Sequence, residues 1–282
     1  MAIEQAKRAL TNAPPPPPPE EGWQARASLS LFAKLCKQEV QAECARVEAV
    51  LSNKELWESI KKNASLGSHN HPRVFHGPCS PGAIATAKPP SHPLKLHKVF
   101  GNRNPVELEV CSGHGDWLVE RAGRDASVNW VGLEMRPDRV HLIWAKAVCA
   151  RRDNVAVLGG TAHEMLRWYV RDGSISRVFV NYPDPPVWHG SRMRLIDEAF
   201  LREVHRVLAP RCCLVIVTDD AAYAKIIIHQ LERVPNLFRS VVHPKLYLDG
   251  VPTDYGSSYF DRMWANGRRT DRYYIEHVRL DA

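Results

Sequence analysis

From Val99 to the C-terminus, short runs of apolar residues alternate with stretches in which apolar residues recur every three or four positions. The runs predict β-strands and the periodic stretches predict helices. The predicted strands cover residues 106–111, 128–133, 155–158, 178–182 and 212–218, with further strand-like runs near residue 240 and at 273–280. The predicted helices start at about residue 116, lie between residues 134 and 151, and cover about 195–208 and 221–233. Strands that alternate with helices indicate a parallel sheet covered on both faces, and the leading topology is the doubly wound α/β sheet.

The first third of the chain lacks this alternation. Six consecutive prolines at positions 14–19 predict a stiff polyproline II spacer, with docking to an SH3- or WW-type domain as the alternative. Residues 28–51 carry apolar side chains at three- and four-residue steps, so they predict one amphipathic helix with Ser28 as its N-cap. A second short helical segment covers residues 54–62. We expect this region to pack on its own domain, and contact with RNA or a partner is the alternative.

Residues 64–98 are rich in Gly, Pro, Ser and His and predict a loop or linker. Four residues of the types that bind metals lie in this segment, but their spacing matches no common structural zinc site, so we expect no metal. These four residues are His69, His71, His76 and Cys79. The chain is therefore expected to comprise a disordered Pro-rich leader at 1–27, a helical segment with linker at 28–98, and one folded domain at 99–282.

Charge adds a hint about the partner. The formal net charge is +7 and the pI is about 9.1. Residues 1–100 hold 13 Lys/Arg and 8 Asp/Glu, so most of the basic excess lies in the first third. Clustered basic residues favour a polyanion such as nucleic acid, because they replace its condensed counterions. The alternative is that the charge only keeps the protein dissolved.

Several classes of protein are excluded by the same sequence. No apolar run approaches the roughly 18 residues of a membrane span, and we expect no signal peptide at the N-terminus. Seven cysteines without a CxxC pair argue against a disulfide scaffold. We therefore expect a reducing compartment, either cytoplasmic or nuclear, with an organelle not excluded.

The candidate chemistry begins at the turn after the first predicted strand. Gly113 and Gly115 lie in that turn next to a helix start, where a ligand can approach the backbone closely. A dinucleotide fingerprint requires a third glycine where Leu118 stands, which argues against a dinucleotide. Two acids mark the site instead, Glu109 inside the first strand and Glu134 at the end of the second.

These two acids fit a ligand without phosphates. A carboxylate at the Glu134 position can accept hydrogen bonds from two vicinal ribose hydroxyls, and a carboxylate at the Glu109 position suits an ammonium group. S-adenosylmethionine has both groups and a positively charged sulfonium. The alternative is that both residues are strand-end acids of an unrelated α/β domain.

A second cluster follows the fourth predicted strand. Prolines on both sides of Asp184 restrict the backbone there, and the aromatic rings of Tyr182 and Trp188 are available to stack on a base. Parallel strands end at the same edge of a sheet, so this cluster shares the ligand edge with the two acids. A stiff turn without function is the alternative for this segment taken alone.

Taken together, the motifs resemble tRNA (guanine-N7)-methyltransferases of the TrmB type, over roughly residues 99–280. The motifs are Glu109-Val110-Cys111-Ser112-Gly113-His114-Gly115, Gly132-Leu133-Glu134, Tyr182-Pro183-Asp184-Pro185, Thr218-Asp219 with Tyr223, and Ser258-Tyr259-Phe260-Asp261. The resemblance implies a Rossmann-like class I methyltransferase sheet, here with an N-terminal helical extension. It also implies methyl transfer from S-adenosylmethionine to N7 of a guanine in tRNA.

The resemblance assigns roles residue by residue. The cofactor-binding residues would be Glu109, Gly113, Gly115, Glu134, Thr161 and Ala162, and the substrate-binding residues Trp188, Arg192, Asp219, Ser258 and Asp261. Asp184 would lie between cofactor and target base as the catalytic residue. N7 of guanine carries a free lone pair, so alignment of the reactants can supply roughly 7–11 kcal/mol without removal of a proton. Asp184 would stabilise the positive charge that develops on the base. Members of the family work with a β-propeller subunit, as homodimers or alone.

Three positions depart from the family pattern. Cys111 replaces a glycine, which is tolerated only if its φ is negative and otherwise lowers cofactor affinity. Thr161 replaces an Asp or Asn. Residues 186–187 separate the Pro-Asp-Pro unit from Trp188, and of the family's following basic run only Arg192 and Arg194 remain. Fewer phosphate contacts there weaken tRNA binding unless the basic first third compensates.

These departures keep two alternatives open. One is a methyltransferase of the same fold that acts on another RNA or a small substrate, and the other is a non-catalytic RNA-binding paralogue. Calorimetry distinguishes the non-catalytic paralogue from the methyltransferase hypotheses, because such a paralogue would not bind S-adenosylmethionine.

Overall fold

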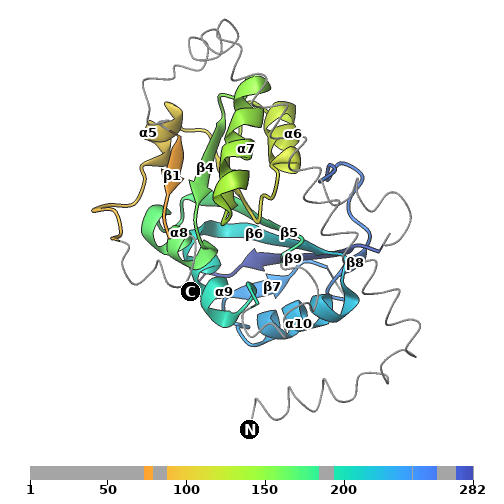
Figure 1. Ribbon diagram of the computed structural model, residues 1–282. Coiled ribbons are helices and arrows are strands. Elements are labelled where there is room, and N and C mark those ends of the chain that lie inside the picture. Colours follow the sequence, from red (N-terminus) through yellow and green to blue (C-terminus); the bar gives the residue numbers. More distant parts are fainter. Residues whose placement is uncertain (1–72, 79–87, 184–193, 243, 259–270, 282) are drawn as a thin grey trace, which may run out of the picture. The chain divides into compact units, whose positions relative to one another are not determined.

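The computed structural model describes residues 73–78, 88–183, 194–242, 244–258 and 271–281 (Figure 1). The leader at 1–27, the helical segments at 28–51 and 54–62, and His69, His71 and Cys79 lie outside these residues. No helix of the described part is long and apolar enough to cross a membrane.

Among the described residues, a nine-stranded sheet forms the centre of the domain, in the order β1-β4-β3-β2-β5-β6-β9-β7, with β8 paired to β9. The neighbouring pairs from β1 to β6 are parallel, and β9 runs antiparallel to β6, β7 and β8. The strands are β1 (Val74–His76), β2 (Val106–Val110), β3 (Asn129–Glu134), β4 (Val155–Gly159), β5 (Ile175–Asn181), β6 (Leu208–Thr218), β7 (Phe238–Ser240), β8 (Leu248–Asp249) and β9 (Tyr273–Arg279).

Helices cover both faces of the sheet (Figure 1). Helices α6 (Asp116–Arg124) and α7 (Pro137–Cys149) pack on one face. The other face is covered by α5 (Leu96–Phe100), α8 (Ala162–Tyr169), α9 (Glu198–Val207) and α10 (Ala221–Glu232). The predicted doubly wound α/β fold is therefore confirmed.

The sequence pattern explains why two cores form. Successive residues of a strand point to opposite faces, so a central strand with apolar residues at every position supplies both layers. In β5, Val178 and Val180 belong to the core under α8 to α10, whereas Phe179 belongs to the core under α6 and α7. Aspartate side chains cap the starts of α9 and α10: the Asp197 carboxylate accepts a hydrogen bond from the backbone N–H of Phe200 at 2.7 Å, and the Asp220 carboxylate accepts one from that of Tyr223 at 2.9 Å.

The amino-terminal boundary differs from the prediction. Residues 64–98 are predicted as a loop or linker, but β1 pairs in parallel with β4 and α5 lies on the sheet. The sheet therefore includes residues before position 99. A strand of three residues is too short to produce a recognisable alternation, so backbone pairing with β4 rather than local pattern creates it.

The order of the strands determines where a ligand can bind. From β2 the chain adds β3 and then β4 on one side, and it later adds β5 and β6 on the other side of β2. The order thus reverses between β2 and β5, and the carboxyl ends of these two strands are neighbours. Ligands of doubly wound sheets bind in the crevice at such a point.

Candidate active site

The turn after β2 is built from left-handed backbone. Cys111, Gly113 and Gly115 have φ values of 62°, 55° and 78°. A Cβ at Gly115 would lie 2.9 Å from the Ile143 side chain, so this position requires glycine. The negative φ under which Cys111 would be tolerated is absent, so the backbone of this residue is strained.

Ser112 connects this turn to β3 by hydrogen bonds. Its hydroxyl donates a hydrogen bond to the Glu109 backbone carbonyl at 2.9 Å and accepts one from the Leu133 N–H at 3.1 Å. The Ser112 N–H donates to the Leu133 carbonyl at 3.1 Å. The turn is thus fixed to the end of β3 before any ligand binds.

Glu109 is buried at the carboxyl end of β2, with 2% of its surface exposed. The Asn181 side-chain amide donates a hydrogen bond to Glu109 Oε1 at 2.7 Å, and the Tyr255 hydroxyl donates to Asn181 Oδ1 at 2.6 Å. Among the described residues, Glu109 Oε2 has no hydrogen-bond partner. A buried carboxylate oxygen in that state is costly unless a donor or a cation binds to it.

Burial raises the pKa of Glu109 to about 7. The Asn181 hydrogen bond opposes the rise, and the neighbouring Glu134 and Asp116 carboxylates add to it. Near neutral pH the carboxyl group is therefore close to its midpoint of ionisation. A cation at Oε2 favours the ionised form and lowers this pKa.

Glu134, at the end of β3, is also buried, but both its oxygens have partners. Oε2 accepts a hydrogen bond from the Gly113 N–H and Oε1 accepts one from the Arg136 N–H, each at 2.9 Å. Glu134 thereby links the turn after β2 to the turn after β3. A carboxylate oxygen can accept more than one hydrogen bond, so these contacts leave room for hydroxyl donors.

A small cavity of about 20 Å³ opens between the ends of β2 and β5. Its lining comes from both strands, from α6 and from the segment before β9. The lining residues are Glu109, Cys111, Ser112, Gly113, His114, Asp116, Trp117, Asn181, Tyr182 and Ser258. The cavity is acidic and partly aromatic, which suits a small cationic ligand.

The comparisons with known proteins agree with this geometry. Residues 103–269 match a family model described as "Putative methyltransferase". The chain is 36% identical over 183 residues to a tRNA (guanine-N(7)-)-methyltransferase of Chlamydia caviae, covering 64% of this chain and 79% of that protein. This chain belongs to the TrmB-type tRNA (guanine-N7)-methyltransferase family.

Other similarities are consistent with that membership. The protein of the same name from Rubrobacter xylanophilus is 30% identical over 187 residues, which cover 66% of this chain and 82% of the relative. The crystal structure of 16S rRNA methyltransferase KamB matches with a TM-score of 0.52 and 14% identity, over 66% of this chain and 93% of that chain. At that identity the match shows the methyltransferase fold alone.

The structure brings several residues predicted for this methyltransferase to one edge. Glu109, Gly113 and Ser258 line the cavity, Gly115 precedes α6 in the turn beside it, and Glu134 ends β3 and binds the Gly113 N–H. Asp219 follows β6 at the same edge of the sheet and is half-buried, but it is not among the residues that line the cavity.

Thr161 and Ala162 lie after β4, outside the cavity lining. The Thr161 hydroxyl donates a hydrogen bond to the Glu164 carboxylate, and Ala162 is the first residue of α8. The Gly160 N–H donates to the Glu134 backbone carbonyl at 3.0 Å, which joins this turn to the end of β3.

Four predicted site residues lie outside the described part of the chain: Asp184, Trp188, Arg192 and Asp261. The described neighbour Tyr182 has a φ of 49°, and the Arg272 guanidinium lies 5.5 Å from the centre of its ring. A strained aromatic residue at a ligand cavity is typical of functional sites.

Two members of the site were not identified from the sequence. Asn181 precedes the Tyr-Pro-Asp-Pro motif, but nothing local indicates that it binds Glu109. Tyr255 is 74 positions further along the chain. Its segment is held against α6, because the Trp117 indole N–H donates to the Tyr255 carbonyl at 2.7 Å and the Arg124 guanidinium donates to the Asp254 carbonyl at 2.6 Å.

Proposed function

We propose that this protein transfers a methyl group from S-adenosylmethionine to N7 of a guanine in tRNA. The observation that carries the proposal is the buried Glu109 carboxylate, whose Oε2 atom lacks a partner among the described residues at the point where the strand order reverses. Membership of the methyltransferase family and the names of the relatives support the reaction and the substrate.

The cofactor would be held by residues of three successive turns. Glu109 would bind its ammonium group, because Asn181 occupies Oε1 and leaves Oε2 for a cationic donor. Glu134 would accept hydrogen bonds from the two ribose hydroxyls. The exposed Met135 side chain, with Thr161 and Ala162, would contact the adenine base. When bound, S-adenosylmethionine supplies an activated methyl group.

The protein's own contribution is orientation and charge. N7 of guanine carries a lone pair in the plane of the ring, so the reaction needs no general base to remove a proton. Alignment of the two reactants in a cavity that excludes water can then supply most of the rate enhancement. Asp184 would stabilise the positive charge that develops on the guanine. Trp188, Arg192, Asp219, Ser258 and Asp261 are proposed to bind the substrate side.

Incubation of the protein with a methyl-labelled cofactor and bulk tRNA, followed by nucleoside analysis, tests the reaction. We expect label in N7-methylguanosine, loss of label for Glu109→Gln, and retention for Glu107→Gln. Glu107 is the matched control, because it lies on the same strand and the same face two residues away. Asp184→Asn should lower the rate while cofactor affinity stays unchanged. A different methylated nucleoside would contradict the proposal.

The departures from the family pattern after Asp184 keep two alternative functions open, and each has a specific test. Label in another RNA or a small molecule, with none in tRNA, would assign a different substrate to the same site. Calorimetry without a heat of cofactor binding would indicate a non-catalytic RNA-binding paralogue. A homodimer or a β-propeller partner subunit stays a prediction from the family resemblance, which size-exclusion chromatography of the purified protein and of cell extracts tests.

A further inference from the structure

A second cavity, larger than the one at the active site, lies at the opposite edge of the sheet. About 640 Å³ in volume, it opens beside the amino-terminal ends of β2 and β5. Its lining residues come from three segments, at 93–97, 102–106 and 171–174. None of these residues was assigned a role from the sequence.

The lining of this amino-edge cavity is basic. Lys95, His97, Arg103 and Arg171 are exposed around it. No ion pair within the described residues engages any of these four side chains. The one carboxylate among the lining residues belongs to Asp172, and the Arg206 guanidinium forms an ion pair with it. The cavity therefore presents uncompensated positive charge to the solvent.

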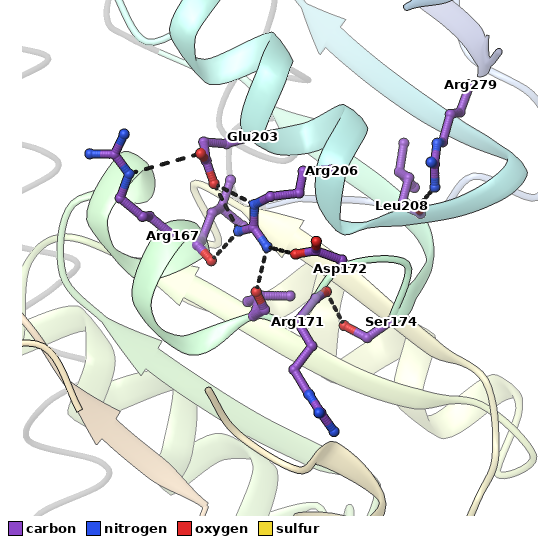
Figure 2. Close-up of polar contacts among 10 residues, drawn as sticks. Arg167, Arg171, Asp172, Ser174, Glu203, Arg206, Leu208 and Arg279 are labelled. Atoms are coloured by element: carbon purple, nitrogen blue, oxygen red, sulfur yellow. Dashed lines mark hydrogen bonds and ion pairs between the residues drawn. The ribbon is translucent and has the colours of Figure 1, made fainter. Parts of the chain in front are cut away.

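The backbone next to Arg171 is held in place by Arg206 (Figure 2). Its guanidinium donates hydrogen bonds to the carbonyls of Leu166 and Val170 at 2.8 and 3.0 Å and to the Glu203 carboxylate at 2.8 and 2.9 Å. The Ser174 hydroxyl donates to the Arg171 carbonyl at 2.7 Å. In Figure 2 the Arg171 side chain extends away from this network, so its guanidinium is free of the contacts that fix its backbone.

We propose that the amino-edge cavity binds consecutive phosphates of the RNA substrate's backbone. Separate exposed cations around an open cavity suit a row of charges, because each cation can pair with a different phosphate and release its counterions. The Asn104 side-chain amide on the same lining donates one hydrogen bond to the Ala126 carbonyl at 3.4 Å, and its second N–H is a donor of the kind that contacts phosphate and sugar oxygens.

One RNA molecule can reach both ends of the sheet. From Val106 to Val110, β2 advances four residues, or about 13 Å at ~3.3 Å per residue. That is roughly four nucleotide steps at about 3.4 Å per step. The proposal rests on the proposed function, since it assigns a second contact surface to the same substrate. It also provides the phosphate contacts that the shortened basic run after Asp184 lacks.

The double variant Arg103→Glu with Arg171→Glu tests this surface in the full-length protein. We expect weaker tRNA binding, and the slope of log Kd against log salt concentration should be smaller by about 2. The value of kcat/KM should fall because KM rises, while kcat stays unchanged. Cofactor affinity by calorimetry should stay unchanged, because Glu109 and Glu134 are at the other edge. The matched control, Lys225→Glu with Arg239→Glu, makes the same charge change at exposed residues that line neither cavity and should bind tRNA more tightly than the double variant.

Three results would overturn or redirect the assignment. Equal tRNA affinity and salt slope for the double variant and its control would overturn it. If the double variant lost inorganic phosphate binding but kept its tRNA affinity, the proposal would also be overturned, and the cavity would be a site for a small anion. Failure of the wild-type protein to methylate tRNA would contradict the proposed function instead, so the two failures are distinguishable.

Discussion

The two ends of strand β2 differ in both burial and charge. At the carboxyl end, the buried Glu109 lines a small cavity together with Asp116. At the amino end, the exposed Lys95, Arg103 and Arg171 surround an open one. A buried carboxylate interacts strongly with one cation, because the surrounding medium screens it little. Exposed cations interact weakly one by one and are screened by salt, so they need a polyanion to contribute together. In our proposals, the same strand thus separates a site for methyl transfer from a surface that binds the RNA backbone.

The largest effect should follow from removal of the carboxyl-end charge. Glu109→Gln keeps the size of the side chain but cannot form an ion pair with an ammonium group. A hydrogen bond to a charged group contributes about 1.5–3 kcal/mol, so we expect S-adenosylmethionine to bind up to about 100-fold more weakly by calorimetry. Glu107→Gln should bind the cofactor like the wild type. Equal affinities for the two variants would contradict the role of Glu109.

The pH dependence of cofactor binding should report the same carboxyl group. With its pKa raised to about 7, Glu109 in the ligand-free protein is mostly protonated at pH 6 and mostly ionised at pH 8. Only the ionised form pairs with an ammonium group, so affinity should rise about tenfold from pH 6 to pH 8. Titration calorimetry in two buffers of different ionisation enthalpy measures both the affinity and the proton released. A flat profile that matches Glu109→Gln would show that this group does not titrate on binding.

A smaller effect should follow when the Tyr255 hydroxyl is removed. Tyr255→Phe leaves Asn181 Oδ1 without the 2.6 Å hydrogen bond that orients its amide toward Glu109. One neutral hydrogen bond contributes about 0.5–1.5 kcal/mol, which predicts a cofactor affinity roughly 3- to 10-fold lower. The pH midpoint of binding should also rise, because the Asn181 donor favours the ionised carboxylate. Tyr247→Phe is the control and should leave both the affinity and the midpoint unchanged.

The smallest effect concerns strain in the turn at the carboxyl end. Cys111 adopts a φ of 62°, which costs a residue with a Cβ about 1–2 kcal/mol. Glycine relieves that strain but loses about 0.5–1 kcal/mol of chain entropy, so Cys111→Gly should stabilise the protein by about 0.5 kcal/mol in urea unfolding. Cys111→Ala retains the Cβ and should gain nothing. An equal gain for both variants would attribute the effect to the thiol rather than to the backbone.

Much of the carboxyl end could be predicted from the sequence. The apolar runs identify β2, β3 and β5, and parallel strands end at one edge, so Glu109 and Glu134 are expected near each other. The structure agrees, since Glu109 lies in β2, Glu134 ends the neighbouring strand β3, and the turn after β2 binds Glu134 through the Gly113 N–H. The contact chain from Tyr255 through Asn181 to Glu109 was not predictable, because its members are 72 and 74 positions apart and share no local pattern.

At the amino end of β2, the individual residues could be read from the sequence but their arrangement could not. Its basic residues are visible in the sequence, but they lie in three segments that read as loops or a linker. The packing of those segments around the strand starts creates the cavity, and an ion pair with Arg206 offsets the negative charge of Asp172 on its lining. Strand β1 is a similar case, since its pairing with β4 comes from tertiary contacts.

The sequence by itself determined the alternation of strands and helices, the sheet edge proposed to bind ligands and the position of two acids at that edge. These features follow from residue spacing along the chain, because the local geometry of strands and helices fixes which residues share a face and where each element ends. Tertiary structure alone decided that Glu109 Oε2 is buried without a hydrogen-bond partner among the described residues, that the backbone of Cys111 is strained and that separate cations surround a common cavity. Each of those depends on atoms that are distant in sequence, and the energy of a buried or clustered charge is set by its neighbours in space.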